Sequence, residues 1–189
     1  MPIAYCLGSG PCKNAFKERR SRKEARMIAE RPIITGGCQC GAVRYAIDGP
    51  LGKAGICHCR MCQKAFGSWG AALVSVPLHI FRWSRGTPGL FRSSAVVDRG
   101  FCAACGTPLS MQEDGDDHIE IAIGTLDDPE IAPPTDQVGI ESRLSWFADL
   151  AALPGRRTED KRTPEELARL KSLQHPDHDT AQWQPSERR

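Results

Sequence analysis

Cysteine is the residue that most constrains what this chain can fold into. The sequence holds nine cysteines, and an odd number cannot pair completely into internal disulfides. Seven of them stand in three tight groups, namely Cys38 and Cys40, then Cys57, Cys59 and Cys62, then Cys102 and Cys105. In a tetrahedral zinc site the sulfur ligands lie about 3.7 Å apart, which cysteines one or two residues apart on a turn can match. The spacing therefore predicts metal sites rather than a disulfide framework.

The rest of the composition favours a protein of a reducing compartment. The N-terminal residues contain no apolar segment typical of a secretory signal. No run of apolar residues approaches the roughly 18 that a membrane-spanning helix needs. We therefore expect a cytoplasmic location, where clustered cysteines are metal ligands or redox groups. A net charge of +2 gives little support to nucleic-acid binding.

The seven clustered cysteines divide most simply into four and three. The three-cysteine set (Cys57, Cys59 and Cys62) lies within six residues and can wrap one ion. The four-cysteine set joins two chelating pairs from distant parts of the chain (Cys38, Cys40, Cys102 and Cys105). A zinc ion with four thiolates is closed and structural, whereas three thiolates leave a position for water or substrate. Two alternatives remain open: an iron–sulfur cluster, and a second structural site completed by a His or Asp.

Short segments of alternating polarity predict a mainly β fold. Val43, Tyr45 and Ile47 alternate with polar or small residues, as in a half-buried strand. Further strands are expected over 69–76, 78–83, 90–97, 107–112 and 118–123, the last two joined by a polar hairpin loop. A capping box at Thr163 to Glu166 predicts a helix near the C-terminus. We expect short antiparallel strands and one short C-terminal helix.

The two ends of the chain differ from its middle. Residues 1–31 carry eight Lys and Arg against three Glu, and we predict a basic, flexible extension. Residues 34–155 form the predicted zinc domain, and residues 156–189 the C-terminal helix and tail. The tail contains residue types that can ligate metal, but they lie in an exposed turn (His175, Asp177, His178 and Asp179). Cys6 and Cys12 have no chelating neighbour and are expected to be free thiols.

Three motifs resemble one family in order and in spacing. They are GCQCGAVRY from Gly37, CHCRMCQK from Cys57 and FCAACGTPL from Phe101. Together with residues 123–129 and 141–146, they are similar to the glutathione-dependent formaldehyde-activating enzymes, the GFA or centromere protein V family. The resemblance covers roughly residues 34–155. It implies an Mss4-like fold with two zinc ions, a structural one on Cys38, Cys40, Cys102 and Cys105 and a catalytic one on Cys57, Cys59 and Cys62.

The resemblance also implies a reaction. The family's founding activity adds glutathione to formaldehyde, a carbon–sulfur lyase activity of the S-hydroxymethylglutathione synthase type. The implied partners are a small-molecule thiol such as glutathione and a small aldehyde. The chain departs from the family at Gln137, where many members place a His. A non-catalytic, zinc-stabilised binding module is the alternative, because a fold alone does not fix function.

Residues near the three-cysteine set could complete the predicted site. Arg60 and Lys64 could offset the charge of three thiolates or hold a substrate carboxylate. His58, between two ligands, is expected to support the site or face solvent rather than bind the same ion. Residues 67–69 (Gly67, Ser68 and Trp69) are candidates for the lining of a pocket.

Overall fold

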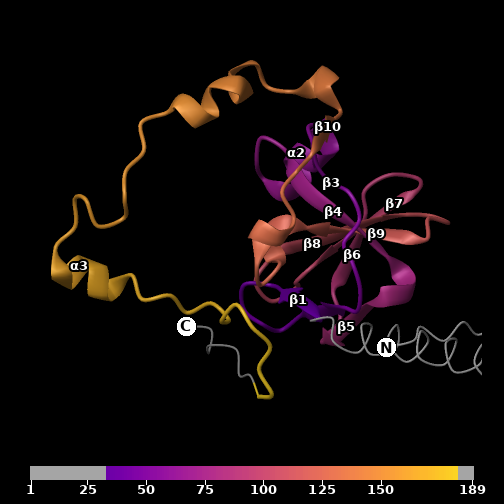
Figure 1. Cartoon of the computed structure of the whole chain (residues 1–189), viewed down its shortest axis with the longest axis horizontal. Helices are drawn as coiled ribbons and strands as arrows, with labels where there is room; N and C mark the ends of the chain where they lie inside the picture. Colours follow the sequence, from indigo (N-terminus) through magenta and orange to yellow (C-terminus); the bar gives the residue numbers. More distant parts are fainter. Residues whose placement is uncertain (1–32, 183–189) are drawn as a thin grey trace, which may run out of the picture. The chain divides into compact units, whose positions relative to one another are not determined.

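The protein, described here from a computed structural model, is built on two β-sheets (Figure 1). The structure describes residues 33–182, so the predicted extension over residues 1–31, Cys6 and Cys12 lie outside the described residues. One sheet has three strands in the order β1-β2-β5. Its strands are β1 (Ile34–Gly37), β2 (Arg44–Ile47) and β5 (Phe81–Arg85).

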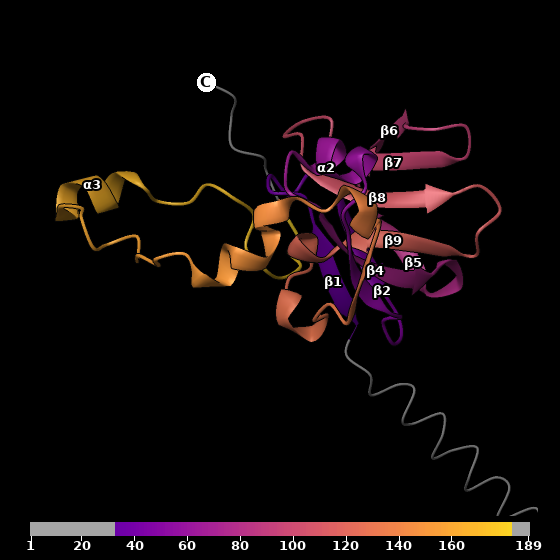
Figure 2. The ribbon, with the colours of Figure 1, turned by 90° about the horizontal axis from the view of Figure 1, so that it is seen from above.

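The second sheet has seven strands in the order β10-β3-β4-β9-β8-β7-β6. Figure 2 shows β6, β7, β8, β9 and β4 side by side in this order. The strands are β3 (Ala54–Cys57), β4 (Ala71–Pro77), β6 (Gly89–Arg92), β7 (Val97–Phe101), β8 (Pro108–Glu113), β9 (His118–Ala122) and β10 (Asp136–Val138). All neighbours in both sheets run antiparallel except β10 and β3, which are parallel.

Within residues 33–182, helical segments are few and short. The α-helices of this range are α2 (Arg60–Phe66) and α3 (Pro164–Arg169). The 3-10 turns are η1 (Leu78–Ile80), η2 (Ile123–Thr125), η3 (Pro129–Ile131), η4 (Ile140–Ser142) and η5 (Ser145–Ala152). The predicted capping box is confirmed at the start of α3, where the Thr163 hydroxyl accepts from the Glu166 amide and the Glu166 carboxylate accepts from the Thr163 amide. The predicted mainly β fold with a short C-terminal helix is therefore confirmed.

The two sheets share one hydrophobic core. Tyr45 and Ile47 of β2 are fully buried together with Val74 and Val76 of β4 and Ile121 of β9. The phenol of Tyr45 is not left unpaired, because its hydroxyl lies 2.9 Å from that of Thr125. This core buries the face of β4 and β9 that carries Val74 and Ile121. The opposite face of the large sheet lies outside this core.

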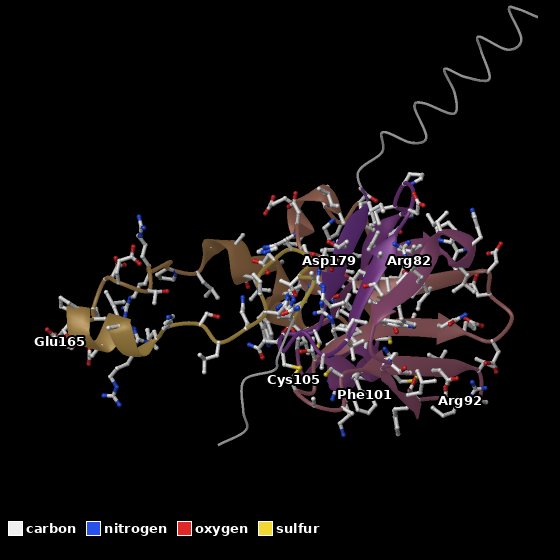
Figure 3. The ribbon with its side chains drawn as sticks, turned by 90° about the horizontal axis from the view of Figure 1, so that it is seen from below. Arg82, Arg92, Phe101, Cys105, Glu165 and Asp179 are labelled. Atoms are coloured by element: carbon white, nitrogen blue, oxygen red, sulfur yellow. The ribbon has the colours of Figure 1, made fainter. Side chains whose placement is uncertain are left out.

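Two predicted strands needed correction. The segment over 90–97 is two strands, β6 and β7, joined by a turn in which the Ser93 amide donates to Val97 O at 2.9 Å. Arg92 ends β6 beside this turn, at the far end from Phe101 (Figure 3). The segment over 78–83 begins with the turn η1 before β5. The apolar pattern runs through both turns, so periodicity alone did not separate them.

Membrane-spanning helices are not found in the part of the chain that the structure describes. Among residues 33–182, no helix combines the length and the hydrophobicity that a bilayer crossing requires.

Candidate metal centres

The four-cysteine set comes together from two turns far apart in the sequence. Cys38 and Cys40 lie in the connection between β1 and β2, and Cys102 and Cys105 follow β7. The Sγ atoms of Cys38 and Cys40 are 3.6 Å apart, and those of Cys40 and Cys102 are 3.7 Å apart. All four Sγ atoms lie within 4.8 Å of one another. These distances fit the roughly 3.7 Å expected between sulfurs around a tetrahedral zinc ion.

Local hydrogen bonds hold the thiols of the four-cysteine set in place. The Val43 amide donates to Cys38 Sγ at 3.3 Å, and the Gly106 amide donates to Cys102 O at 2.8 Å. Gly106 has a φ of 79°, which only glycine adopts at little cost. Burial raises the pKa of the Cys40 thiol to about 12. Burial acts in the same direction on Cys105, but the hydroxyl and amide of Thr107 outweigh it and lower its pKa to about 6.

The three-cysteine set joins a strand end to a helix start. Cys57 ends β3, Cys59 is the N-cap of α2 and Cys62 lies in its first turn. The three Sγ atoms lie within 4.8 Å of one another, so they could hold a metal ion. The sequence did not predict α2, because seven residues are too few to show a helical period. The helix matters for the site, since its N-cap bond, from the Cys62 amide to Cys59 Sγ at 3.4 Å, orients the Cys59 sulfur.

The pKa values of thiols in the three-cysteine set are shifted in opposite directions. Burial raises the pKa of Cys57 to about 12. Burial also opposes ionisation of Cys59, but hydrogen bonds from the Cys62 amide and the neighbouring thiols lower its pKa. Zinc binds thiolates, so metal binding at this set would release the protons that these thiols carry.

Arg99 is the functional residue that sequence reasoning missed. Its Nη2 lies 3.4 Å from Cys62 Sγ, and its Nε donates to Ser93 Oγ at 3.0 Å. The side chain is only 7% exposed, and Nη1 has no hydrogen-bond partner within residues 33–182. A buried guanidinium needs a negative partner, and three thiolates around one zinc ion leave an excess negative charge. No spacing signals this contact, because only the pairing of β7 with the rest of the sheet brings residue 99 to residue 62.

The residues predicted to offset that charge lie elsewhere. The guanidinium of Arg60 donates to Gln63 Oε1 rather than to a sulfur, and Lys64 is exposed. Gln63 itself is buried, and its amide nitrogen donates to His58 O at 2.7 Å and to Ser142 O at 2.9 Å. Gln63 thus ties the start of α2 to the η4 turn.

His58 is fully buried behind the three-cysteine set. Its Nε2 lies 2.9 Å from Oε1 of Gln137. Its ring packs edge-on to Phe147 at 4.6 Å between centroids, and Trp69 packs on the same phenyl ring at 4.9 Å. The His58 amide also donates to Val138 O at 2.9 Å. His58, which links Cys57 to Cys59, is therefore held by β10 through this bond and by η5 through Phe147.

Gly139 forms the tightest contact with this link. Its φ is 64°, and a Cβ at this position would lie 2.8 Å from the amide nitrogen of Cys59. The approach of η4 to the three-cysteine set therefore requires glycine.

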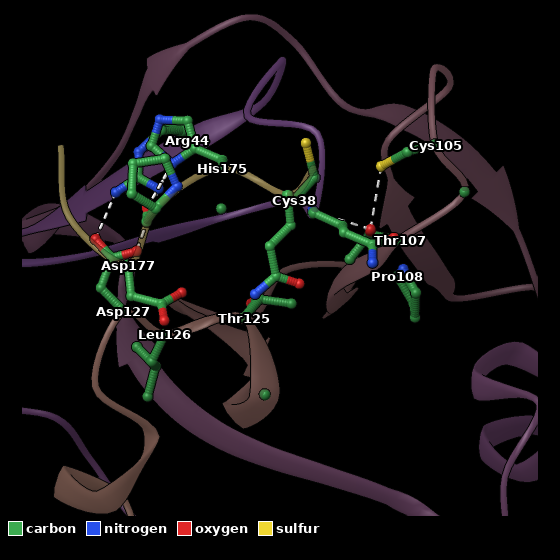
Figure 4. A pocket seen from close by; sticks show the side chains of 16 residues that line it. Cys38, Arg44, Cys105, Thr107, Pro108, Thr125, Leu126, Asp127, His175 and Asp177 are labelled. Carbon is green, nitrogen blue, oxygen red and sulfur yellow. Dashed lines mark hydrogen bonds and ion pairs between the residues drawn. The ribbon is translucent and has the colours of Figure 1, made fainter. Parts of the chain in front are cut away.

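The C-terminal tail forms an ion-pair cluster instead of a metal site. Arg44, only 2% exposed, pairs with Asp127 at 2.5 Å and with Asp179 at 2.7 Å. His175 is buried beside it, with Nδ1 at 3.2 Å from Arg44 Nη1 and Nε2 at 3.4 Å from Arg85 Nη1. Figure 4 shows His175 and Arg44 together at one side of a pocket that Cys38 and Cys105 also line. Figure 3 shows Asp179 against the strands.

Comparison with known proteins places the chain in one family. The sequence profile of the glutathione-dependent formaldehyde-activating enzymes, GFA, matches residues 33–142, more than half of the chain. The chain belongs to the GFA family. The profile spans all seven clustered cysteines, Arg99 and Gln137, so both cysteine sets lie within the family domain.

The structural comparison adds a distant neighbour. A crystal structure of a Rhodobacter sphaeroides protein, a structural genomics target, has 22% sequence identity and a TM-score of 0.46. The match covers 55% of this chain and 99% of that one. No curated protein matches the chain.

Proposed function

We propose that this GFA-family protein is a zinc-dependent enzyme of the carbon–sulfur lyase type, similar to S-hydroxymethylglutathione synthase. It adds glutathione or a similar small thiol to formaldehyde or another small electrophile. Two zinc ions are required, one in each cysteine set. The observation that carries the proposal is the contrast between a closed set of four thiols and an open set of three beside a cavity and a buried cation.

The four-cysteine set supports a structural role. Its sulfurs already have the separation of a tetrahedral zinc site, and four thiolates leave no position for a substrate. It joins the β1–β2 connection to the turn after β7, so a metal there ties the two sheets together. None of the seven thiols is in a disulfide, which suits a reducing compartment such as the cytoplasm.

The three-cysteine set supports a catalytic role. Within residues 33–182, no fourth His, Cys, Asp or Glu ligand joins its sulfurs. Cys57 lines a cavity of about 430 Å³, so a small molecule can reach the set. Arg99 places a positive charge at Cys62 and favours an anionic ligand such as a thiolate in the remaining position.

The proposed reaction needs no redox partner. The sulfur of the thiol bonds to the carbonyl carbon, the C=O π bond breaks, and the proton lost by the thiol ends on the carbonyl oxygen. Zinc, when bound, would supply the Lewis acidity that lowers the pKa of the thiol. The protein's own part is to orient Cys59 and Cys62 through the cap of α2 and to hold Arg99 against the sulfurs. His58, buried and bonded to Gln137, keeps the strand end rigid.

The proposal is tested by metal content, thiol binding and exchange rate. We expect two zinc ions per wild-type chain and one in Cys59→Ser, with the far-ultraviolet circular dichroism unchanged. Glutathione should alter the visible spectrum of the cobalt-substituted wild type and not that of Cys59→Ser. Exchange of formaldehyde between its free and glutathione-bound forms, followed by NMR, should be faster with the wild type than in buffer.

Two results would oppose the proposal. A wild-type cobalt spectrum unaffected by any thiol, together with exchange at the buffer rate, would favour the zinc-stabilised binding module. Global unfolding of Cys59→Ser would show that the three-cysteine set is structural as well.

A further inference from the structure

The outer face of the seven-stranded sheet carries the three-cysteine set and continues beyond it. Residues directly opposite each other in a sheet point to the same side. Cys57 lies opposite Ala71, Leu73 opposite Gly55 and Ala122, and Ser75 opposite Glu120. Glu120 in turn lies opposite Met111, and Met111 opposite Arg99. The register therefore places Cys57, Arg99 and Glu120 on one face, away from the shared core.

This face has a cavity that extends from Cys57 of the three-cysteine set to Ser75 of β4 and Glu120 of β9. The cavity, called here the outer trough, has a volume of about 430 Å³, and Cys57 lines it at one end. Its floor includes Leu73 and Met111, and its polar residues include Glu120, Lys53 and Asp136. Lys53 pairs with Asp136, so its charge is already matched.

Among the acids that line the outer trough, Glu120 is partly buried, whereas Glu113 and Asp116 are exposed. Glu120 makes no ion pair with any residue between 33 and 182. Burial raises its pKa, and the nearby Asp116 does the same, whereas a hydrogen bond from Ser75 and the charge of His118 act in the opposite direction. A partly buried carboxylate without a cation is costly, and a ligand that brings a cation would relieve that cost.

The length of the outer trough limits the ligand. Ala71 and Ser75, opposite Cys57 and Glu120, are four residues apart on β4, which corresponds to roughly 13 Å along the strand. An extended chain of three to four residues spans about 10–14 Å. A short peptide with its thiol at the three-cysteine set can therefore direct a terminal ammonium group toward Glu120, because the Cys57 and Glu120 side chains, which both line the outer trough, cover part of this distance.

We infer that the outer trough binds the body of the thiol substrate and that Glu120 determines specificity by pairing with an ammonium group remote from the thiol. The inference rests on the proposed function, since it takes the thiol end to lie at the three-cysteine set. It names a substrate class, a peptide-sized thiol with a cationic amine, and it assigns Glu120 a role in binding and none in bond making.

The test compares two thiols that differ only at the amine. Glutathione carries an ammonium group, and N-acetylglutathione has the same length and thiol without that charge. Titration of the cobalt-substituted wild type should give about tenfold tighter binding of glutathione, as expected for a charge-assisted hydrogen bond. Glu120→Gln should bind both thiols with the weaker affinity. Glu113→Gln removes an equal charge from an exposed position of the same trough and should keep the discrimination.

The outcomes separate this inference from the proposed function. Equal binding of the two thiols by the wild type, or discrimination that survives in Glu120→Gln, would overturn the role of Glu120 and leave the proposed function standing. A spectrum that neither thiol alters would overturn both. The wild-type comparison needs no variant, so the inference stays testable even if Glu120→Gln does not fold.

Discussion

The four-cysteine set and the three-cysteine set use the same ligand chemistry in different surroundings. The four-cysteine set joins the main core, where Cys38 and Cys102 pack with Tyr45 and Val74. The three-cysteine set belongs to a smaller cluster on the outer face of the large sheet, with Leu73 and Ala122. The first spans two distant segments and the second spans six residues. Under the proposed function, ligand count and exposure, more than ligand type, separate a structural metal site from a catalytic one.

The sharpest way to break the comparison is to remove one ligand from each set. A structural zinc ion contributes about 10–16 kcal/mol of apparent binding free energy at neutral pH, as much as or more than the 5–15 kcal/mol of stability of a typical domain. We therefore expect Cys102→Ser to unfold the domain, whereas Cys59→Ser stays folded. Thermal unfolding followed by circular dichroism checks this. Equal loss of structure in the two variants would erase the distinction.

A smaller effect is expected from Arg99, whose Nη2 lies 3.4 Å from Cys62 Sγ. A hydrogen bond to a charged group is worth about 1.5–3 kcal/mol, so Arg99→Gln should weaken metal binding at the three-cysteine set by about 10- to 100-fold. Competition with a chromophoric chelator measures the zinc affinity of the three-cysteine set, and the zinc ion of the four-cysteine set should be retained. Arg99→Lys keeps the charge and should recover part of the affinity. An unchanged affinity in Arg99→Gln would show that the guanidinium is only packed there.

Gly139 offers a test of the support behind the three-cysteine set. Gly139→Ala would place a Cβ 2.8 Å from the Cys59 amide nitrogen, in addition to the cost of a positive φ of about 1–2 kcal/mol. Gly115→Ala is the matched control, because its φ is 78° and no atom lies within 4 Å of the added carbon. Both variants should lose thermal stability, but only Gly139→Ala should lower the zinc affinity of the three-cysteine set. Identical zinc affinities in the two would contradict the contact.

The smallest expected effect concerns the tail beside the four-cysteine set. Burial lowers the pKa of His175, and the neighbouring Arg44 and Arg85 add to the shift. The folded state therefore favours the neutral imidazole, so tail docking is strongest above the ordinary His pKa of about 6.5 and weakens as the pH falls. Protection of the His175 amide, which donates to Gln39 O at 2.8 Å, should fall on acidification relative to an amide of β9. Constant relative protection would contradict this.

The sequence by itself determined the ligands and the class of fold. Chelate spacing alone divides the clustered cysteines into four and three, and the folded chain brings the same two groups together. Spacing carries this information because ligands one or two residues apart are held near each other by the backbone alone. Alternation of polarity likewise predicted β2 and β9, a nearly continuous apolar run predicted β4, and the capping box predicted α3, since these are local effects.

Only the tertiary structure decided what surrounds the ligands. Arg99 reaches Cys62, Glu120 shares a face with Cys57, and Gln137 meets His58 because strand order and register bring them together. Arg60 and Lys64 were the natural candidates from the sequence, yet Arg60 donates to Gln63 and Lys64 is exposed. The physical reason is that a sheet joins residues tens of positions apart through pairing, and no local pattern records which strands will be neighbours.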